Sequence, residues 1–68
     1  MLDTKYLIRN ATNMLWYTED HAVPMADRWS PNITDAAQYT TKADALIEIE
    51  ADDHGLTIFN IFEVTIKI

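Results

Sequence analysis

Two short runs of side chains in the 68-residue sequence are of types that bind metal ions. Residues 19–21 read Glu-Asp-His, and residues 52–54 read Asp-Asp-His. Carboxylates and imidazoles are common ligands of zinc and other transition metals. Adjacent side chains on a helix point in different directions, however, and neither run has the spacing of a known metal motif. We therefore expect both runs to be solvated, with no metal ion and no cofactor bound.

Nucleophilic and phosphate-binding chemistry has equally little support. Cysteine is absent, and the single serine, Ser30, lies outside any nucleophile motif. The single glycine, Gly55, is too few for a phosphate-binding loop. We expect a non-enzyme without catalytic residues, and the least favoured alternative is a small enzyme or metal protein that uses His21 or His54.

Charge and hydropathy limit the partners. Eleven acidic residues against five basic ones give a formal charge of −6. Nucleic acids and anionic membranes attract cations, so we expect no direct binding to either. No apolar run approaches the roughly 20 residues that span a bilayer, and the N-terminus lacks the pattern of a signal peptide. These features predict a single domain over residues 1–68 in the cytosol.

The first half of the chain predicts a hairpin followed by a loop. Residues 5–9 and 14–18 are β-rich and flank an asparagine-containing turn at 10–13. Residues 19–32 have no clear period and carry both prolines, which predicts a long loop. Trp29 is expected to turn inward from this loop and cap the core. Residues 36–39 predict either a short third strand or an extended approach to a helix.

The clearest local signal is a helix start at Thr41. Thr41 and Asp44 form a capping box with Asp in place of the usual Glu, which predicts a helix over residues 42–53. Gly55 follows, where a left-handed C-terminal residue is favoured. The helix is expected to bury a broad apolar stripe that consists of Ala43, Ala45, Leu46, Ile47 and Ile49.

The rest of the chain, residues 56–68, is β-rich. Alternation is strict from Phe62 onward, with Val64, Ile66 and Ile68 on the same face, whereas Asn60 predicts a bulge or break. Such a strand is expected to be either central in the sheet or paired with a second copy of the chain. The overall prediction is an α+β fold: one helix packed on a small, mainly antiparallel sheet of three to four strands.

A pattern of aromatic, alanine and helix-start residues runs through Tyr6, Trp29, Ala36, Tyr39, Thr41, Lys42 and Ala45. It resembles a pattern found in short phage and prophage accessory proteins of unknown function. The shared features are a tyrosine-containing hairpin, a tryptophan, an Ala-x-x-aromatic step, and Thr-Lys opening a helix with Ala four residues after the Thr. The resemblance extends from Tyr6 to Ala45, and the long segment 19–28 and the long final strand depart from it. It implies a phage-type accessory protein in the host cytosol, a group that includes anti-CRISPR and other inhibitors of host proteins.

Acidic residues line one side of the expected helix. Asp44, Glu48 and Asp52 are spaced at i, i+4 and i+8, and Asp53 adds a further charge. Such a patch would attract a basic surface on a partner, and apolar side chains would provide most of the affinity. Our first hypothesis is therefore a non-enzymatic protein that binds and inhibits a host protein with a basic surface. Its expected contacts are Asp44, Glu48, Asp52 and Asp53 on the helix, with Met25 and Trp29 as loop anchors if they are not buried.

Two alternatives remain open at this point. The acidic face could simply be solvated and keep a small protein in solution. The protein could also be a structural or assembly protein that self-associates as a homodimer through a sheet edge.

Overall fold

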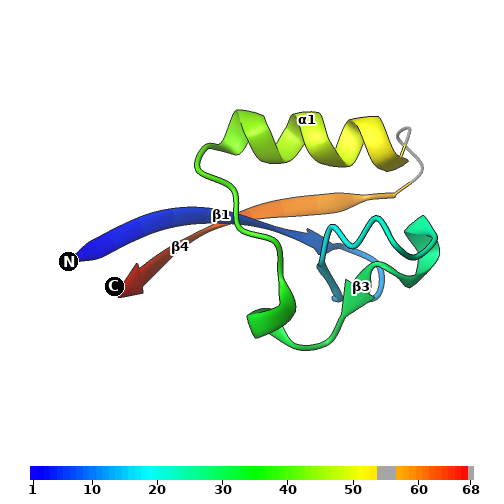
Figure 1. Ribbon diagram of the computed structural model, residues 1–68, viewed down its shortest axis with the longest axis horizontal. Helices are drawn as coiled ribbons and strands as arrows, with labels where there is room; N and C mark the ends of the chain where they lie inside the picture. The colour runs from blue at the N-terminus through cyan, green and yellow to red at the C-terminus, as the bar shows by residue number, and fades with distance from the viewer. Residues whose placement is uncertain (54–56, 68) are drawn as a thin grey trace.

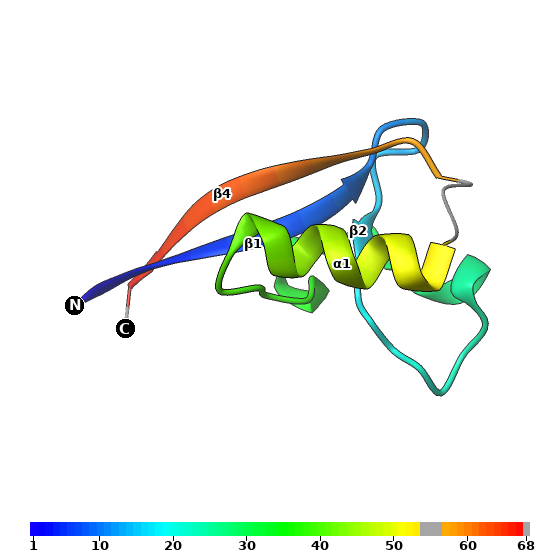
Figure 2. The same ribbon diagram turned by 90° about the horizontal axis from the view of Figure 1, so that it is seen from above.

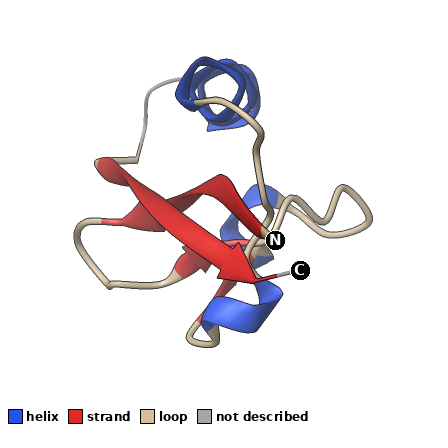
Figure 3. Cartoon of the chain, turned by 90° about the vertical axis from the view of Figure 1, so that its left-hand side faces the viewer, coloured by secondary structure: helices blue, strands red, loops and turns tan. Residues whose placement is uncertain are grey.

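The computed structural model describes residues 1–53 and 57–67, apart from the side chains of Met25, Asp52 and Asp53. Its described residues form an antiparallel four-stranded sheet in the order β3-β2-β1-β4 and one α-helix, α1, that lies across one face of the sheet (Figures 1 and 3). This arrangement confirms the predicted α+β fold. The elements are β1 (Leu2–Asn10), β2 (Trp16–Tyr17), β3 (Trp29–Ser30), α1 (Lys42–Asp53), β4 (Phe59–Lys67) and the 3-10 turns η1 (Met25–Asp27) and η2 (Ile33–Asp35).

The predicted hairpin joins β1 to β2, with Arg9 opposite Trp16. Asn10 shapes the turn because its Oδ1 atom accepts hydrogen bonds from the backbone N–H groups of Thr12 (2.8 Å) and Asn13 (3.3 Å). The strand bounds differ from the prediction of 5–9 and 14–18. Met14 has a φ of 63°, which removes it from the extended region, so the second strand begins only at Trp16.

The segment predicted as one long loop contains a short strand. Trp29 lies opposite Tyr17 in β3, and Ser30 lies opposite Trp16. The ring of Trp29 packs 5.2 Å from that of Tyr17, which confirms that this tryptophan turns toward the core. Residues 36–39 do not form a strand of their own, since Tyr39 makes only an isolated bridge to Tyr6.

The helix has the predicted bounds, Lys42–Asp53. The Thr41 hydroxyl caps it by accepting a hydrogen bond from the Asp44 backbone N–H at 3.1 Å. The predicted broad stripe is wrong in width, because Ala43 is exposed and the Ile47 side chain is 67% exposed. A helix that touches a single layer buries only a narrow face, and here Ala45 and Ile49 occupy it. Gly55, the predicted C-terminal residue, lies outside the described residues.

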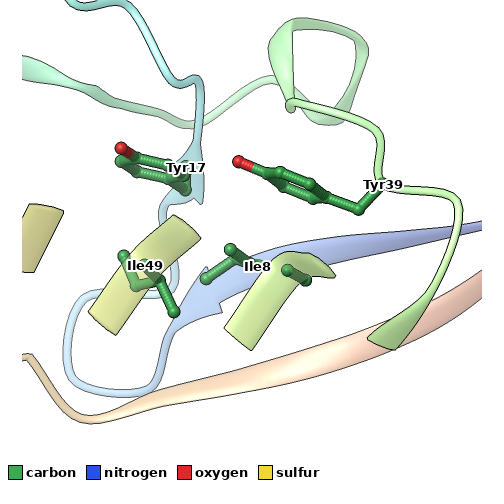
Figure 4. Close-up of a cluster of buried hydrophobic side chains, with 5 residues drawn as sticks. Ile8, Tyr17, Tyr39 and Ile49 are labelled. Atoms are coloured by element: carbon green, nitrogen blue, oxygen red, sulfur yellow. The ribbon is translucent and has the colours of Figure 1, made fainter. Parts of the chain in front are cut away.

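The core lies between α1 and the sheet, and Figure 4 shows Ile49 of the helix together with Ile8, Tyr17 and Tyr39. Ala45 completes the buried cluster. Half-buried side chains pack around its rim, namely Tyr6, Trp29, Ala37, Phe59 and Ile61. With 12 residues, α1 is too short to cross a membrane, and no other described helix is longer.

The final strand runs antiparallel to β1 in one unbroken register, from Leu2 opposite Lys67 to Asn10 opposite Phe59. The predicted bulge or break at Asn60 is therefore wrong over the described range of β4. Asn60 lies opposite Arg9 and is exposed, so its polar side chain needs no irregular backbone to reach solvent. The prediction that this strand could be central is also wrong, because β4 is at one edge of the sheet.

The buried side of β4 changes partway along the strand. Phe59 and Ile61 face the core beneath α1, so alternation places Phe62, Val64 and Ile66 on the opposite face of the sheet. Val64 and Ile66 are half-buried there, whereas Glu63 on the helix side is exposed. The first part of β4 therefore buries its helix-facing side chains, and the second part partly buries the side chains on the opposite face.

Candidate functional site

The predicted acidic row on α1 does not present all its members to solvent in the same way. Asp44 is exposed in the first turn, where the positive end of the helix dipole favours a carboxylate. Glu48 is half-buried, and its Oε1 atom lies 3.2 Å from Nε2 of His21 in the preceding loop. Asp52 and Asp53 end the helix, and their side chains lie outside the described part of the chain.

The two predicted loop anchors have different outcomes. Trp29 is half-buried and packs against Tyr17 at the edge of the core, so much of its apolar surface is already used within the chain. Met25 begins η1, and its side chain is outside the described residues. Of the two predicted loop anchors, Trp29 therefore offers only part of its apolar surface for contact with a partner.

A long free strand edge is the most extended feature of the surface. β4 has nine residues and β1 as its only neighbour in the sheet, so its outer edge has no strand partner among the described residues. Edge strands carry backbone N–H and C=O groups that can pair with another chain. The opposite edge, β3, has only two residues and offers far less of this surface.

The free edge continues into a ribbon that projects from the body of the molecule. In Figures 1 and 2 the start of β1 and the end of β4 extend together beyond α1. Leu2 at the tip of this ribbon is 68% exposed. A two-stranded ribbon is marginally stable in water without a layer packed on it. The projecting part is thus the region with most to gain from a partner.

The charges on the β4 strand of this ribbon follow a simple pattern. Glu63 and Lys67 lie on the helix side of β4, and Thr65 lies between them on the same face. All three are exposed. On the other face, Val64 and Ile66 are half-buried. The free edge therefore carries an acid and a base on one face and aliphatic side chains on the other.

A cation–aromatic stack joins three strands on the face opposite α1. The Arg9 guanidinium lies 5.4 Å from the ring centre of Trp16 and 5.7 Å from that of Phe62. The two rings themselves meet edge to face at 5.7 Å. Such contacts contribute about 0.5–1 kcal/mol each at partly exposed sites. The stack links β2, β1 and β4, and so it holds the edge strand in register with the rest of the sheet.

A second polar group joins the loop before η1 to the helix. His21 Nε2 lies 3.7 Å from Glu19 Oε1 and 3.2 Å from Glu48 Oε1. The Tyr39 hydroxyl donates a hydrogen bond of 2.9 Å to Glu19 Oε2. Burial, followed by this hydrogen bond and the charge of Glu19, raises the pKa of Tyr39 far above its ordinary value. The hydroxyl therefore remains a hydrogen-bond donor to the carboxylate.

Local structure explains how the loop returns to the helix. The Asp20 carboxylate accepts a hydrogen bond from the Ala22 N–H at 3.0 Å, and Glu19 has a φ of 55°, in the left-handed region. The loop is closed where the N–H and hydroxyl of Thr18 both bond the Arg28 carbonyl, at 2.8 and 2.9 Å. The sequence showed the 19–21 run, but nothing local to it pointed to Glu48, which only the packing of the loop against α1 brings near.

No pocket is found over the described ranges, 1–53 and 57–67. The candidate site is therefore the free edge and projecting ribbon of β4, an exposed strand surface. Comparisons of the chain with protein-family models, curated proteins and solved structures found no match.

Proposed function

We propose that this protein has no catalytic activity and acts as an assembly protein that self-associates through the free edge of β4. The observation that carries this proposal is an unbulged nine-residue edge strand that projects beyond the helix. Two copies would join antiparallel across this edge and form one continuous sheet. New backbone hydrogen bonds would provide most of the attraction, as in other strand-addition complexes.

The charge pattern selects one register for this pairing. In an antiparallel pair of identical strands, the twofold axis passes through a residue that then lies opposite its own copy. With the axis at Thr65, Glu63 of each copy lies opposite Lys67 of the other. Opposite charges facing across strands stabilise a pair by about 0.2–1 kcal/mol, and this register forms the pair twice.

The neighbouring registers lose this complementarity. An axis at Glu63 would place two carboxylates face to face, which is destabilising. An axis at residue 61, 62 or 64 would place Glu63 opposite Phe59, Ile61 or Thr65, none of which carries a charge. The Thr65 register also places Val64 opposite Ile66 on the other face of the sheet. It uses the projecting end of β4, where α1 does not stand over the strand (Figure 1).

Charge reversal tests this register directly. We expect Glu63→Lys or Lys67→Glu alone to weaken dimerisation, because each variant places like charges opposite each other, whereas the double exchange E63K/K67E restores it. Sedimentation velocity over a range of protein concentrations and at low salt measures the dimer fraction. Glu50→Lys, at an exposed helix position, makes the same charge change as Glu63→Lys and should leave the dimer fraction unaltered. A strictly monomeric wild type, or a double exchange that fails to restore the dimer, would contradict the proposal.

A covalent probe locates the axis. The chain contains no cysteine, so Thr65→Cys introduces a single thiol at the expected twofold axis. We expect it to form a disulfide-linked dimer under mild oxidation much faster than Thr12→Cys, which places a thiol in the exposed β1–β2 turn. Equal rates for the two variants would place the interface elsewhere.

The second candidate function is the phage-type inhibitor of a host protein with a basic surface. The net charge of −6 and the exposure of Asp44 favour it. It has less support, because Glu48 lies against His21 and Trp29 packs against the core. Chemical cross-linking in host lysate, with Asp44→Lys as the matched variant, tests this candidate: capture of a basic protein that is lost in the variant would favour it over self-association.

A further inference from the structure

We propose that Glu19, His21 and Glu48 form a zinc site that ties the loop before η1 to α1. Their three potential ligand atoms lie within 4.8 Å of one another. Two of these side chains come from the loop, and the third comes from the middle of the helix. A bound ion would therefore link two segments that are far apart in the sequence. This inference is independent of self-association through β4.

The two separations from the His21 nitrogen are close to the spacing of ligands around a tetrahedral zinc ion. Ligands at about 2.0–2.2 Å from a tetrahedral zinc ion lie about 3.3–3.6 Å from one another. The observed separations from His21 Nε2 are 3.2 Å to Glu48 and 3.7 Å to Glu19, on either side of this range.

Tyr39 orients one of the ligands. Its hydroxyl bonds Oε2 of Glu19, whereas Oε1 of the same carboxylate faces His21. Ligating carboxylates are commonly held by a second group in this way, which fixes the atom that faces the metal. Tyr39 itself is buried in the core cluster, so its hydroxyl is held in place by the fold. We assign it a positioning role.

The donor set favours zinc over calcium or magnesium. One imidazole nitrogen and two carboxylate oxygens are typical zinc ligands, whereas Ca²⁺ and Mg²⁺ prefer oxygen ligands alone. Two carboxylates also balance the charge of a divalent ion. The fourth ligand would be water, since His21 is exposed. With no pocket detected in the described residues, the expected role is to join the loop to the helix.

Titration of the full chain with ZnCl₂ near neutral pH tests this site, with binding measured by calorimetry and stability by thermal melting. We expect zinc to raise the melting temperature by at least about 10 °C at a hundredfold excess over Kd. Glu48→Gln and His21→Gln should abolish this shift, and Tyr39→Phe should weaken binding by about 10–100-fold. Far-ultraviolet circular dichroism without zinc shows whether each variant still folds.

Two matched variants separate this site from other zinc ligands. Glu50→Gln changes an exposed carboxylate on the same helix, and His54→Gln removes the histidine of the Asp-Asp-His run at residues 52–54. Both should bind zinc as the wild type does. Nitrogen NMR of the imidazoles should show zinc bound to Nε2 of His21, a readout that does not depend on stability. Absence of a zinc-dependent shift in the wild type, or its loss in His54→Gln but not in Glu48→Gln, would overturn the assignment.

Discussion

The two ends of the β1–β4 pair differ in what packs on them. At one end, Ile8 and Ile61 lie opposite each other beneath α1, and Ile8 is completely buried. At the other end, Leu2 and Lys67 form the tip of a ribbon that extends beyond the helix (Figure 2). The strand pairing is continuous between them. Within one regular strand pair, the part beneath α1 contributes side chains to the core, and the part beyond α1 is available for contact with a partner.

Truncation of one side chain at each end of β1 should give the largest contrast. Ile8→Ala leaves a cavity in the core and should lower the free energy of unfolding by about 2–5 kcal/mol. Leu2→Ala removes a side chain that is mostly exposed, and its effect should be below about 1 kcal/mol. Urea denaturation monitored by tryptophan fluorescence measures both. Comparable losses would show that the ribbon is packed as tightly as the core.

Alkaline pH should weaken the covered end selectively. The Tyr39 hydroxyl has a pKa raised from 10.0 by burial and by Glu19, so above pH 10 the folded state retains a proton that the unfolded state loses. The contribution of Tyr39 to stability should therefore be constant below about pH 10 and fall above it, by at most about 1.4 kcal/mol per pH unit. Tyr39→Phe should make this slope smaller, and Tyr6→Phe, on the same face of the sheet, serves as the control. Identical slopes in wild type and Tyr39→Phe would contradict this account.

Loss of the helix cap should destabilise the part of the β1–β4 pair that lies beneath α1. Thr41→Ala removes the oxygen that accepts the Asp44 N–H, at a cost of about 1 kcal/mol. Thr41→Ser retains that oxygen and should remain close to the wild type. Thermal melting followed by circular dichroism measures the difference. If the alanine variant melts with the wild type, the first turn of α1 does not contribute to the stability of the core.

Hydrogen exchange provides the finest comparison because it needs no substitution. The backbone amides of β1 that lie under the helix, near Ile8, should exchange more slowly than those near the tip, at Asp3 and Thr4. Dimerisation through β4 should slow exchange at Thr65 and its neighbours while leaving Ile8 unchanged. Two-dimensional NMR at low and high protein concentration measures both effects. Uniform protection along β1 would mean that the ladder opens as one unit.

Local signals in the sequence were sufficient for the helix and the first turn. Thr41 supplies a cap whose partner is three residues away, so the start of the helix follows from neighbouring residues alone. Asn10 likewise bonds within its own turn. The two-residue strand β3 is too short to show a period, and for that reason the loop prediction missed Trp29–Ser30.

Features that depend on packing could not be predicted in the same way. The side of β4 that is buried changes near Phe62 because α1 covers only the first part of the strand. The sequence does not show how much of β4 the helix covers. The sequence predicts that β4 is either central in the sheet or paired with a second copy, and its local pattern does not decide between these two positions. The approach of Glu48 to His21 was missed, because their proximity depends on how the loop folds back.

The change of buried side along β4 means that one strand belongs to two separate surfaces. Substitutions at Phe59 or Ile61 affect the interior of a single molecule, whereas substitutions at Val64 or Ile66 affect a face that α1 does not cover. The exposed positions near the tip, such as Thr65 and Lys67, can therefore vary with little penalty to monomer stability. Evolution could thus retune or abolish contact with another copy in a few steps while the hydrophobic interior stays intact.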